Sequence, residues 1–294
     1  MSEQKINGNI SAGVKFAFFG TPEPSAIILE HLKNSGFIPS LIITGEDQPK
    51  GRDLVLTSPE VKVWAEENGI AYIQPKTLRD KEVIGSIKKY GDFDFFVLVV
   101  YGKILPKEIL DIPKRGIINV HPSLLPKLRG PSPIKGAILS QFETGTTIMK
   151  LDSEVDHGPI LAQKKVISWK IPNDIPYEKD LEKMLAEEGG KLLAETLPKW
   201  IDGKVKETEQ DHSNATFTKK IEKSEGELDL NEPALTNLRK IRAFHRWPTA
   251  YFFRNGKRII VKRAHIENDE LILDKVIPEG KKEMSYSDFL KGQK

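Results

Sequence analysis

The sequence predicts an α/β protein with an open, mostly parallel sheet and a second, small β-barrel domain. Strand-like and helix-like segments alternate over 15–168, which is typical of parallel sheets whose crossovers are helices. The run 94–100 is apolar after Asp94, as expected of a strand covered on both faces. Short strand-like runs in 251–273 surround an Asn255-Gly256 turn signal and indicate a small barrel. At roughly 150 residues per domain, 294 residues fit two domains.

The individual elements follow from apolar spacing and punctuation. Strands are expected at the β-rich or apolar runs 15–19, 39–44, 94–100, 116–121 and 146–151. Helices are expected where apolar residues recur at helical spacing, at 25–35, 59–68, 79–90 and 177–200. The last of these is long and keeps one apolar stripe, although Gly189-Gly190 weakens its middle. The second domain is expected to hold a helix at 235–244 and strands at 251–253, 258–261 and 270–273.

Composition also predicts the domain boundaries. The stretch 202–213 is polar, as linkers are. We therefore expect a loose tail at 1–14, a catalytic domain at 15–201, a linker at 202–213 and a C-terminal domain at 214–294. The formal net charge is only +3, but it is uneven: 17 basic face 13 acidic residues over 211–294. Nine Lys or Arg and no acid fall within 239–263, which favours phosphate binding or, as the alternative, a solvated face.

Several classes of protein are excluded or disfavoured. The chain has no cysteine, so disulfides, Cys-ligated zinc and cysteine nucleophiles are ruled out. Its apolar runs are far shorter than the roughly 20 residues of a membrane helix, and 1–14 has no signal-peptide core, so a cytoplasmic location is the default. The segment Gly20–Pro24 lacks the G-x-G-x-x-G spacing of dinucleotide-binding loops. No His or acid spacing predicts a metal site.

Two polar segments follow predicted strands. Asn119 and His121 end the strand 116–121, and alternation places both side chains on one side, where open α/β sheets bind ligands. The loop 151–159 carries Asp152, Glu154 and Asp156, and a carboxylate beside His121 would favour the imidazolium. The spacing does not say which acid this is. The alternative is a hydrogen-bonded core histidine, a turn asparagine and surface acids.

The only hydroxyl near these residues is that of Ser123, and it lacks the glycine flanks of a nucleophile elbow. The residues therefore favour direct transfer between two bound substrates over a covalent intermediate. Asn and protonated His donate hydrogen bonds to an oxyanion, and Asp assists proton transfer.

These motifs are similar to those of a known family. Asn119-x-His121, Ser123-Leu-Leu-Pro126 with Gly130, Pro133 and Ile134, and Asp156-x-Gly158 resemble the 10-formyltetrahydrofolate-dependent formyltransferases. Further similarities lie at Phe19–Pro22, Pro49–Arg52, Ser58–Lys62 and Tyr101–Pro106. At the C-terminal end, Arg242-Ala-Phe with Trp247-Pro and Gly280–Lys282 with Met284 resemble the members that act on methionyl initiator tRNA.

The resemblance implies a Rossmann-like catalytic domain, an OB-like C-terminal tRNA-binding domain and 10-formyltetrahydrofolate as co-substrate. We also expect a monomer and no metal. The resemblance also implies that Asn119, His121 and Asp156 are catalytic. It implies folate contacts from Ser123, Leu124, Leu125 and Pro126, and from the turn of Tyr101, Gly102, Lys103, Ile104 and Leu105. For tRNA contacts the candidates are Lys50, Arg52, Lys257, Arg258, Lys262 and Arg263, each with a solvated surface or turn role as the alternative.

The sequence departs from the family in several places. Pro24 stands where phenylalanine is usual, the loop 46–58 is short and partly acidic, and 267–281 is compressed, so the barrel is expected to lack a strand or to have tighter turns. Two other functions stay open. A sugar N-formyltransferase acting on a nucleotide-linked amino sugar shares the Asn-x-His and Asp motifs, and an inactive RNA-binding homologue would keep the basic domain. A glycinamide ribonucleotide formyltransferase is disfavoured because it needs no C-terminal barrel.

Overall fold

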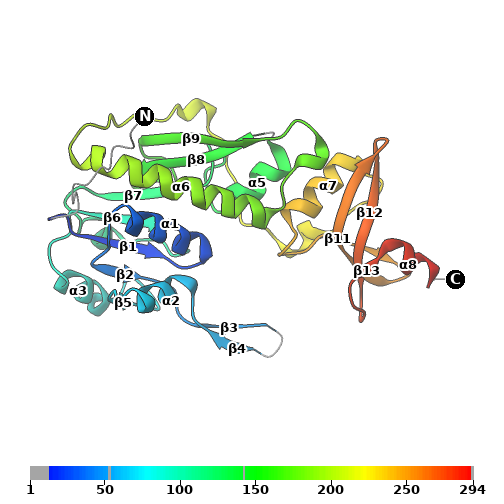
Figure 1. Cartoon of the computed structure of the whole chain (residues 1–294), viewed down its shortest axis with the longest axis horizontal. Coiled ribbons are helices and arrows are strands. Elements are labelled where there is room, and N and C mark those ends of the chain that lie inside the picture. The colour runs from blue at the N-terminus through cyan, green and yellow to red at the C-terminus, as the bar shows by residue number, and fades with distance from the viewer. Residues whose placement is uncertain (1–12, 52–53, 142, 293–294) are drawn as a thin grey trace, which may run out of the picture. The chain divides into compact units, whose positions relative to one another are not determined.

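The computed structural model describes residues 13–51, 54–141 and 143–292. Its largest element is a seven-stranded sheet in the order β5-β2-β1-β6-β7-β8-β9 (Figure 1). The strands are β1 (Phe16–Gly20), β2 (Leu41–Ile43), β5 (Tyr72–Ile73), β6 (Phe95–Val99), β7 (Ile117–His121), β8 (Glu143–Lys150) and β9 (Ile160–Ser168). The pairs among β5, β2, β1, β6 and β7 are parallel, whereas β7 and β8 are antiparallel. The predicted Rossmann-like, mostly parallel sheet is therefore confirmed.

Helices cover both faces of the parallel strands, which explains why these strands are apolar throughout. Side chains on one face, such as Phe18 and Val97, pack with α1 (Glu23–Asn34), α2 (Glu60–Glu67) and α6 (Glu178–Ile201). Those on the other face pack with α3 (Lys81–Lys89) and α4 (Lys107–Leu110). A separate hairpin is formed by β3 (Gln48–Lys50) and β4 (Val55–Thr57), whose apolar side chains are largely exposed.

The glycine pair in the middle of α6 has a packing role that helix propensity does not predict. A Cβ on Gly189 would lie 2.9 Å from Val120 Cγ1, and a Cβ on Gly190 would lie 2.7 Å from the ring of His31. The two glycines therefore let α6 lie close to β7 and to α1. The approach to β7 positions the strand that carries Asn119 and His121.

The chain forms two compact units. The first comprises residues up to His121, Thr146–Lys164 and Ala186–Gln210, and the second comprises Pro122–Gly145, Lys165–Leu185 and the residues from Asp211 onward. The division thus does not follow chain order, because β8, β9 and α6 each contribute to both units. The boundaries 15–201, 202–213 and 214–294 stay a prediction. A loose tail is expected at 1–14, and its residues 1–12 lie outside the described part of the chain.

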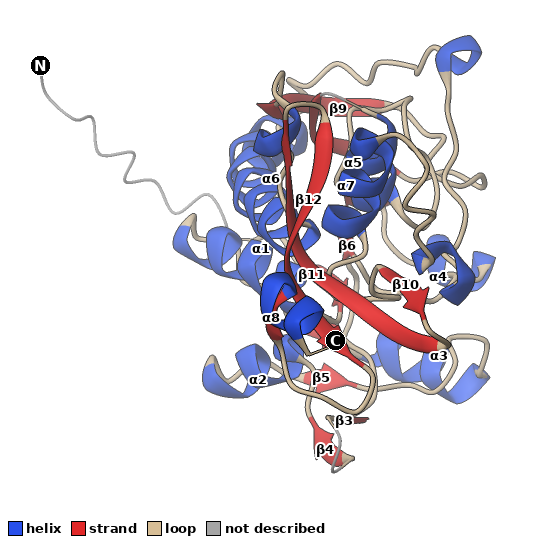
Figure 2. Ribbon diagram, turned by 90° about the vertical axis from the view of Figure 1, so that its right-hand side faces the viewer, coloured by secondary structure: helices blue, strands red, loops and turns tan. Residues whose placement is uncertain are grey.

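The second unit contains a four-stranded antiparallel sheet in the order β10-β11-β12-β13. These strands are Tyr251–Arg254, Lys257–Glu267, Glu270–Pro278 and Met284–Ser285. The strands expected at 251–253, 258–261 and 270–273 are confirmed as β10, β11 and β12 (Figure 2). The helices of this unit include α5 (Pro133–Ser140), α7 (Ala234–Ala243) and α8 (Tyr286–Lys291). Asn255 and Gly256 both have positive φ and join β10 to β11, as the sequence predicted. The apolar side chains of α7 pack against β11 and β12.

The buried apolar side chains form an extensive core. Among the described residues, no helix is long and apolar enough to cross a membrane.

Candidate functional site

Asn119 and His121 lie at the carboxyl end of β7. They are two residues apart in an extended strand, so both side chains point to the same side of the sheet. Asn119 pairs with Met149 of β8, and His121 pairs with Thr147. Their exposed fractions are only 6% and 4%. An amide and an imidazole are therefore held side by side in a largely dry position.

Asp156 supplies the carboxylate. It lies in the loop between β8 and β9, and its Oδ1 lies 3.6 Å from Nδ1 of His121, within ion-pair distance. Its side chain is 14% exposed. The backbone of Asp156 has φ +50°, a left-handed conformation that a non-glycine residue adopts only when its surroundings hold it there.

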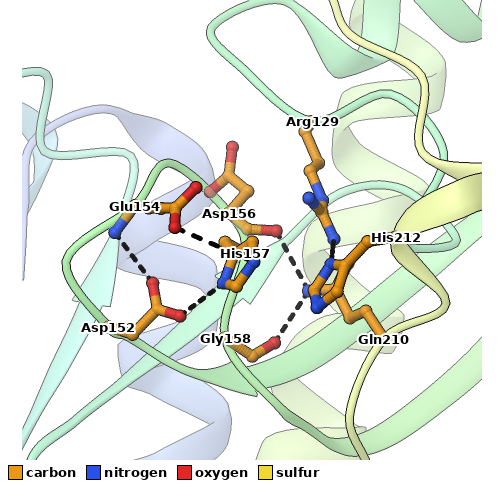
Figure 3. A network of polar contacts seen from close by, with 8 residues as sticks. All are labelled: Arg129, Asp152, Glu154, Asp156, His157, Gly158, Gln210 and His212. Carbon is orange, nitrogen blue, oxygen red and sulfur yellow. Dashed lines mark hydrogen bonds and ion pairs between the residues drawn. The ribbon is translucent and has the colours of Figure 1, made fainter.

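The other two acids of the loop face a different partner. Asp152 Oδ2 lies 2.6 Å from Nδ1 of His157, and Glu154 Oε1 lies 4.0 Å from Nε2 of the same ring (Figure 3). Asp152 also accepts a hydrogen bond from the backbone N–H of Glu154. Of the three candidate acids, the structure thus pairs only Asp156 with His121.

These three side chains suit acyl transfer. A buried amide N–H and an imidazolium N–H are hydrogen-bond donors for negative charge that develops on a carbonyl oxygen, and burial strengthens both. A carboxylate beside the imidazole stabilises its charged form and orients the ring. The described residues include no group of three or more His, Asp or Glu that could hold a metal ion.

The turn of Tyr101–Leu105 follows β6, the strand next to β7. Tyr101 itself is buried in the core, where its ring packs edge-on against Phe19. Its hydroxyl has no hydrogen-bond partner among the described residues, and burial raises its pKa, so the phenol stays neutral. Lys103 Nζ donates to the carbonyls of Pro75 and Lys76. Gly102 and Ile104 are exposed, and Leu105 is half-buried.

The segment Ser123–Pro126 belongs to the second compact unit. Ser123 is fully buried, and its Oγ donates to the carbonyl of Lys127 at 2.6 Å. Leu125 is buried, whereas Leu124 and Pro126 are half-buried, and the Leu125–Pro126 peptide is cis. The serine hydroxyl therefore bonds within its own turn.

Some of the candidate tRNA-binding side chains are exposed, whereas others contact partners within the protein. Lys257 and Arg263 of β11 are exposed. The Arg258 guanidinium instead stacks on Tyr251, with its carbon 3.8 Å from the ring centre, and Lys262 Nζ donates to the carbonyl of His245 at 2.9 Å. In the first unit, Lys50 on β3 pairs with Glu60 at 3.0 Å. Arg52 lies outside the described residues.

Two family models match the chain. The model described as formyl transferase matches residues 14–197, and the one described as formyl transferase, C-terminal domain, matches residues 220–271. The chain belongs to the formyl transferase family. Its N-terminal match contains Asn119, His121 and Asp156, and its C-terminal match contains the four basic candidates of β11.

Relatives of this formyl transferase include several proteins named methionyl-tRNA formyltransferase. The methionyl-tRNA formyltransferase of Chloroflexus aggregans is 39% identical, over 86% of this chain and 81% of that protein. The methionyl-tRNA formyltransferase of a Geobacillus species is 36% identical, over 95% of this chain and 94% of that protein. A sugar N-formyltransferase from a Shewanella species has a TM-score of 0.64 at 16% identity, over 86% of this chain and 98% of that one, which shows a shared fold.

One buried polar residue beside Asp156 has no signal in the sequence. Gln210 is 4% exposed, and its side-chain amide donates to the carbonyls of Asp156 and Gly158 (Figure 3). It falls in the stretch 202–213, whose polar composition predicts a linker. A single glutamine in a polar stretch has no spacing that would mark it as buried.

Proposed function

We propose that this formyl transferase transfers the formyl group of 10-formyltetrahydrofolate to the α-amine of methionyl initiator tRNA, forming N-formylmethionyl-tRNA for translation initiation. One observation carries the catalytic part: the buried group of Asn119, His121 and Asp156 at the carboxyl end of β7. The choice of acceptor is supported by relatives named methionyl-tRNA formyltransferase, which match the chain through both domains.

In the proposed mechanism, the neutral amine attacks the formyl carbon directly. The side-chain N–H of Asn119 and the protonated ring of His121 donate hydrogen bonds to the formyl oxygen as it gains negative charge. Asp156 keeps that ring charged and accepts the proton that the amine loses, directly or through water. The new N–C bond replaces the bond from the formyl carbon to the folate nitrogen, which takes up a proton. No covalent enzyme intermediate is needed, in keeping with the internal hydrogen bond of Ser123.

We further propose the folate contacts that the family resemblance implies. In the turn Tyr101–Leu105, the exposed residues Gly102 and Ile104 are available for contact with the pterin. The ring of Tyr101 is buried and anchors the turn in the core. Ser123–Pro126 is a second proposed contact, with its serine acting through the shape of the turn.

We propose that phosphates of the tRNA bind the exposed side chains Lys257 and Arg263, supported by their position in a stretch without acids. Arg258 and Lys262 are proposed to support this surface, because both have internal partners. Lys50 and Arg52 are the proposed contacts for the acceptor end. We also propose that the protein acts as a monomer in the cytoplasm, which light scattering and cell fractionation can test.

A formyl-transfer assay tests the proposed function. The protein is incubated with 10-formyltetrahydrofolate and, in parallel, with methionyl initiator tRNA or a nucleotide-linked amino sugar. We expect formylmethionyl-tRNA as the main product. Preferential formylation of the sugar would retain the catalytic residues but contradict the assigned acceptor, and no turnover on either amine would favour an inactive RNA-binding homologue.

A further inference from the structure

The loop 151–159 has to hold Asp156 in one unusual conformation. Its φ of +50° is left-handed, and its carboxylate faces His121 from a loop with no regular hydrogen-bond ladder of its own. A non-glycine residue in this region returns to extended or right-handed backbone unless neighbouring contacts oppose the change. A rotation there would also turn the side chain away from His121. Two sets of contacts hold this loop.

The first contact is the close approach of Gly158 to β8. A Cβ on Gly158 would lie 2.1 Å from the carbonyl oxygen of Lys150, so only glycine allows the two backbones to lie this close. The backbone N–H of Lys150 also donates to the carbonyl of Pro159 at 3.0 Å. This anchors the C-terminal side of the loop, but it does not hold the carbonyl of Asp156.

The second contact is Gln210. Its Nε2 donates to the carbonyl of Asp156 at 3.0 Å and to the carbonyl of Gly158 at 2.7 Å, so one amide group bonds both sides of His157 (Figure 3). The strand-like bridge between Ile160 and Thr208 brings Gln210 to this position, with reciprocal backbone hydrogen bonds of 2.8 and 2.9 Å. All of these residues belong to the first compact unit.

We propose that Gln210 is a positioning residue for catalysis, which holds the carbonyls of Asp156 and Gly158 and thereby keeps the Asp156 carboxylate beside His121. Both of these hydrogen bonds end on backbone carbonyls, so through them Gln210 acts on the backbone of the loop. The amide is suited to this role because its two N–H groups can serve two carbonyl acceptors while the group stays uncharged in a buried place. This role rests on the proposed function of Asp156.

The test compares Gln210→Ala and Gln210→Met with the unaltered protein. Methionine keeps most of the volume but donates no hydrogen bond, so it separates the loss of donors from the loss of packing. We expect both variants to lower kcat about 10- to 100-fold with nearly unchanged KM for both substrates, because a small misplacement of a catalytic group has an effect of this size. A wild-type kcat in Gln210→Met would overturn the proposal.

Asn237→Ala is the matched control. Asn237 is also fully buried, and its side-chain amide also donates to two backbone carbonyls, those of Asp229 and Glu232, but it belongs to the second unit. We expect it to lose stability as the Gln210 variants do while keeping kcat. An equal loss of kcat in this control would show that the effect reports general destabilisation rather than positioning.

A double mutant tests whether Gln210 acts through Asp156. If it does, Gln210→Ala combined with Asp156→Ala should be no slower than Asp156→Ala alone, because the positioned group is already gone. Multiplied losses would contradict the proposal.

Hydrogen exchange of the peptide that covers 151–159 measures the same contact without substrate. Faster exchange is expected in both Gln210 variants and not in Asn237→Ala. Unchanged exchange in the Gln210 variants would overturn the positioning role even if the protein formylated another acceptor. Faster exchange in a protein with no activity on methionyl-tRNA would instead contradict the proposed function alone.

Discussion

The carboxylate of Asp156 lies 3.6 Å from Nδ1 of His121, although 34 residues separate them in the chain and the acid comes from a loop rather than a strand. The pair is largely buried, so the attraction between a charged imidazole and a carboxylate is weakened less than it would be in water. Asn119, two residues before His121, completes a group of two hydrogen-bond donors and one proton acceptor.

If Asn119 donates a hydrogen bond to the formyl oxygen as proposed, its replacement removes one oxyanion donor. We expect Asn119→Ala to lower kcat about 10²- to 10³-fold, the usual cost of one oxyanion donor, with little change in KM for the folate. Steady-state kinetics with methionyl initiator tRNA measure this effect, and circular dichroism checks the fold. A folded Asn119→Ala protein with an unchanged rate would remove this residue from the mechanism.

The close packing of α6 on β7 predicts an unusual effect of an added methyl group. Gly189→Ala improves helix propensity, but its Cβ would lie 2.9 Å from Val120 Cγ1, in the strand between the two donor residues. We expect a net loss of about 1–3 kcal/mol in the free energy of unfolding from overpacking, and a lower kcat from the displaced strand.

Gly85→Ala is the control for this change. Gly85 also lies within a helix, α3, but nothing lies within 4 Å of its added Cβ. We expect it to stabilise the protein by about 0.5–1 kcal/mol and to leave kcat unchanged. Urea unfolding measures both variants, and equal stabilisation by the two alanines would show that α6 does not approach β7 as described.

A buried ion-pair cluster predicts a pH effect on stability. Burial alone would raise the pKa of Glu178, but hydrogen bonds from Arg246 and Lys135, each at 2.9 Å, outweigh it and hold that pKa below its ordinary value. A lowered pKa in the folded state stabilises the protein above the unfolded-state pKa, and this stabilisation is lost as the pH falls through the folded-state pKa. Ionisation of Glu182 has the opposite effect on stability, because burial raises the pKa of its carboxyl in spite of the nearby Arg246.

Glu178→Gln isolates the first of these two contributions. We expect it to cost about 1–3 kcal/mol of unfolding free energy at neutral pH, and this difference should shrink as the pH is lowered from about 5 toward about 3. Urea unfolding at a series of pH values measures it. A difference that stays constant over this range would contradict the assigned pairing.

Salt dependence tests the proposed RNA surface. If Lys257 and Arg263 each contact a phosphate, replacing either by alanine should reduce the slope of log Kd against log salt concentration by about 1. Lys88→Ala, an exposed lysine on α3 outside that surface, should leave the slope unchanged. Binding of initiator tRNA measured at several salt concentrations decides between phosphate contact and a solvated surface. Equal slopes in all four proteins would support the latter.

Much of the fold could be predicted from apolar spacing, but strand direction could not. The apolar run 94–100 corresponds to β6, and the long helix expected at 177–200 is α6. The strand expected at 146–151 corresponds to β8, whose antiparallel pairing with β7 has no signature in a single strand. The sequence does not predict the strand β9 or the β3–β4 hairpin, since their alternation is weak or their side chains are largely exposed. It does not predict the helix α5 either, which has only 8 residues.

The glycine pair shows why propensity alone misjudges α6. Gly189 and Gly190 lower the intrinsic stability of a helix, yet Val120 and His31 occupy the space that larger side chains would need. This reason exists only in the packed structure. Likewise, the sequence predicts neither β13 nor α8, at the C-terminal end of the described residues, because both elements are short.

Part of the site was accessible from sequence for a simple geometric reason. Strand alternation places Asn119 and His121 on one side of β7, whatever the rest of the chain does. Which of three loop acids meets His121 depends instead on the left-handed backbone at Asp156, and that conformation depends on contacts with distant segments. Gln210, the residue that makes two of those contacts, lies 54 residues further along the chain.

The single-turnover rate of formylmethionyl-tRNA formation tests the proposed role of Asp156 most directly. It is measured for the unaltered protein and for Asp156→Asn, with both substrates saturating. Asparagine keeps the shape of the side chain but neither stabilises the charged imidazole nor accepts the proton. We expect a rate about 10²- to 10⁴-fold lower in the variant, with the substrates still bound. Equal single-turnover rates in the two proteins would contradict this role.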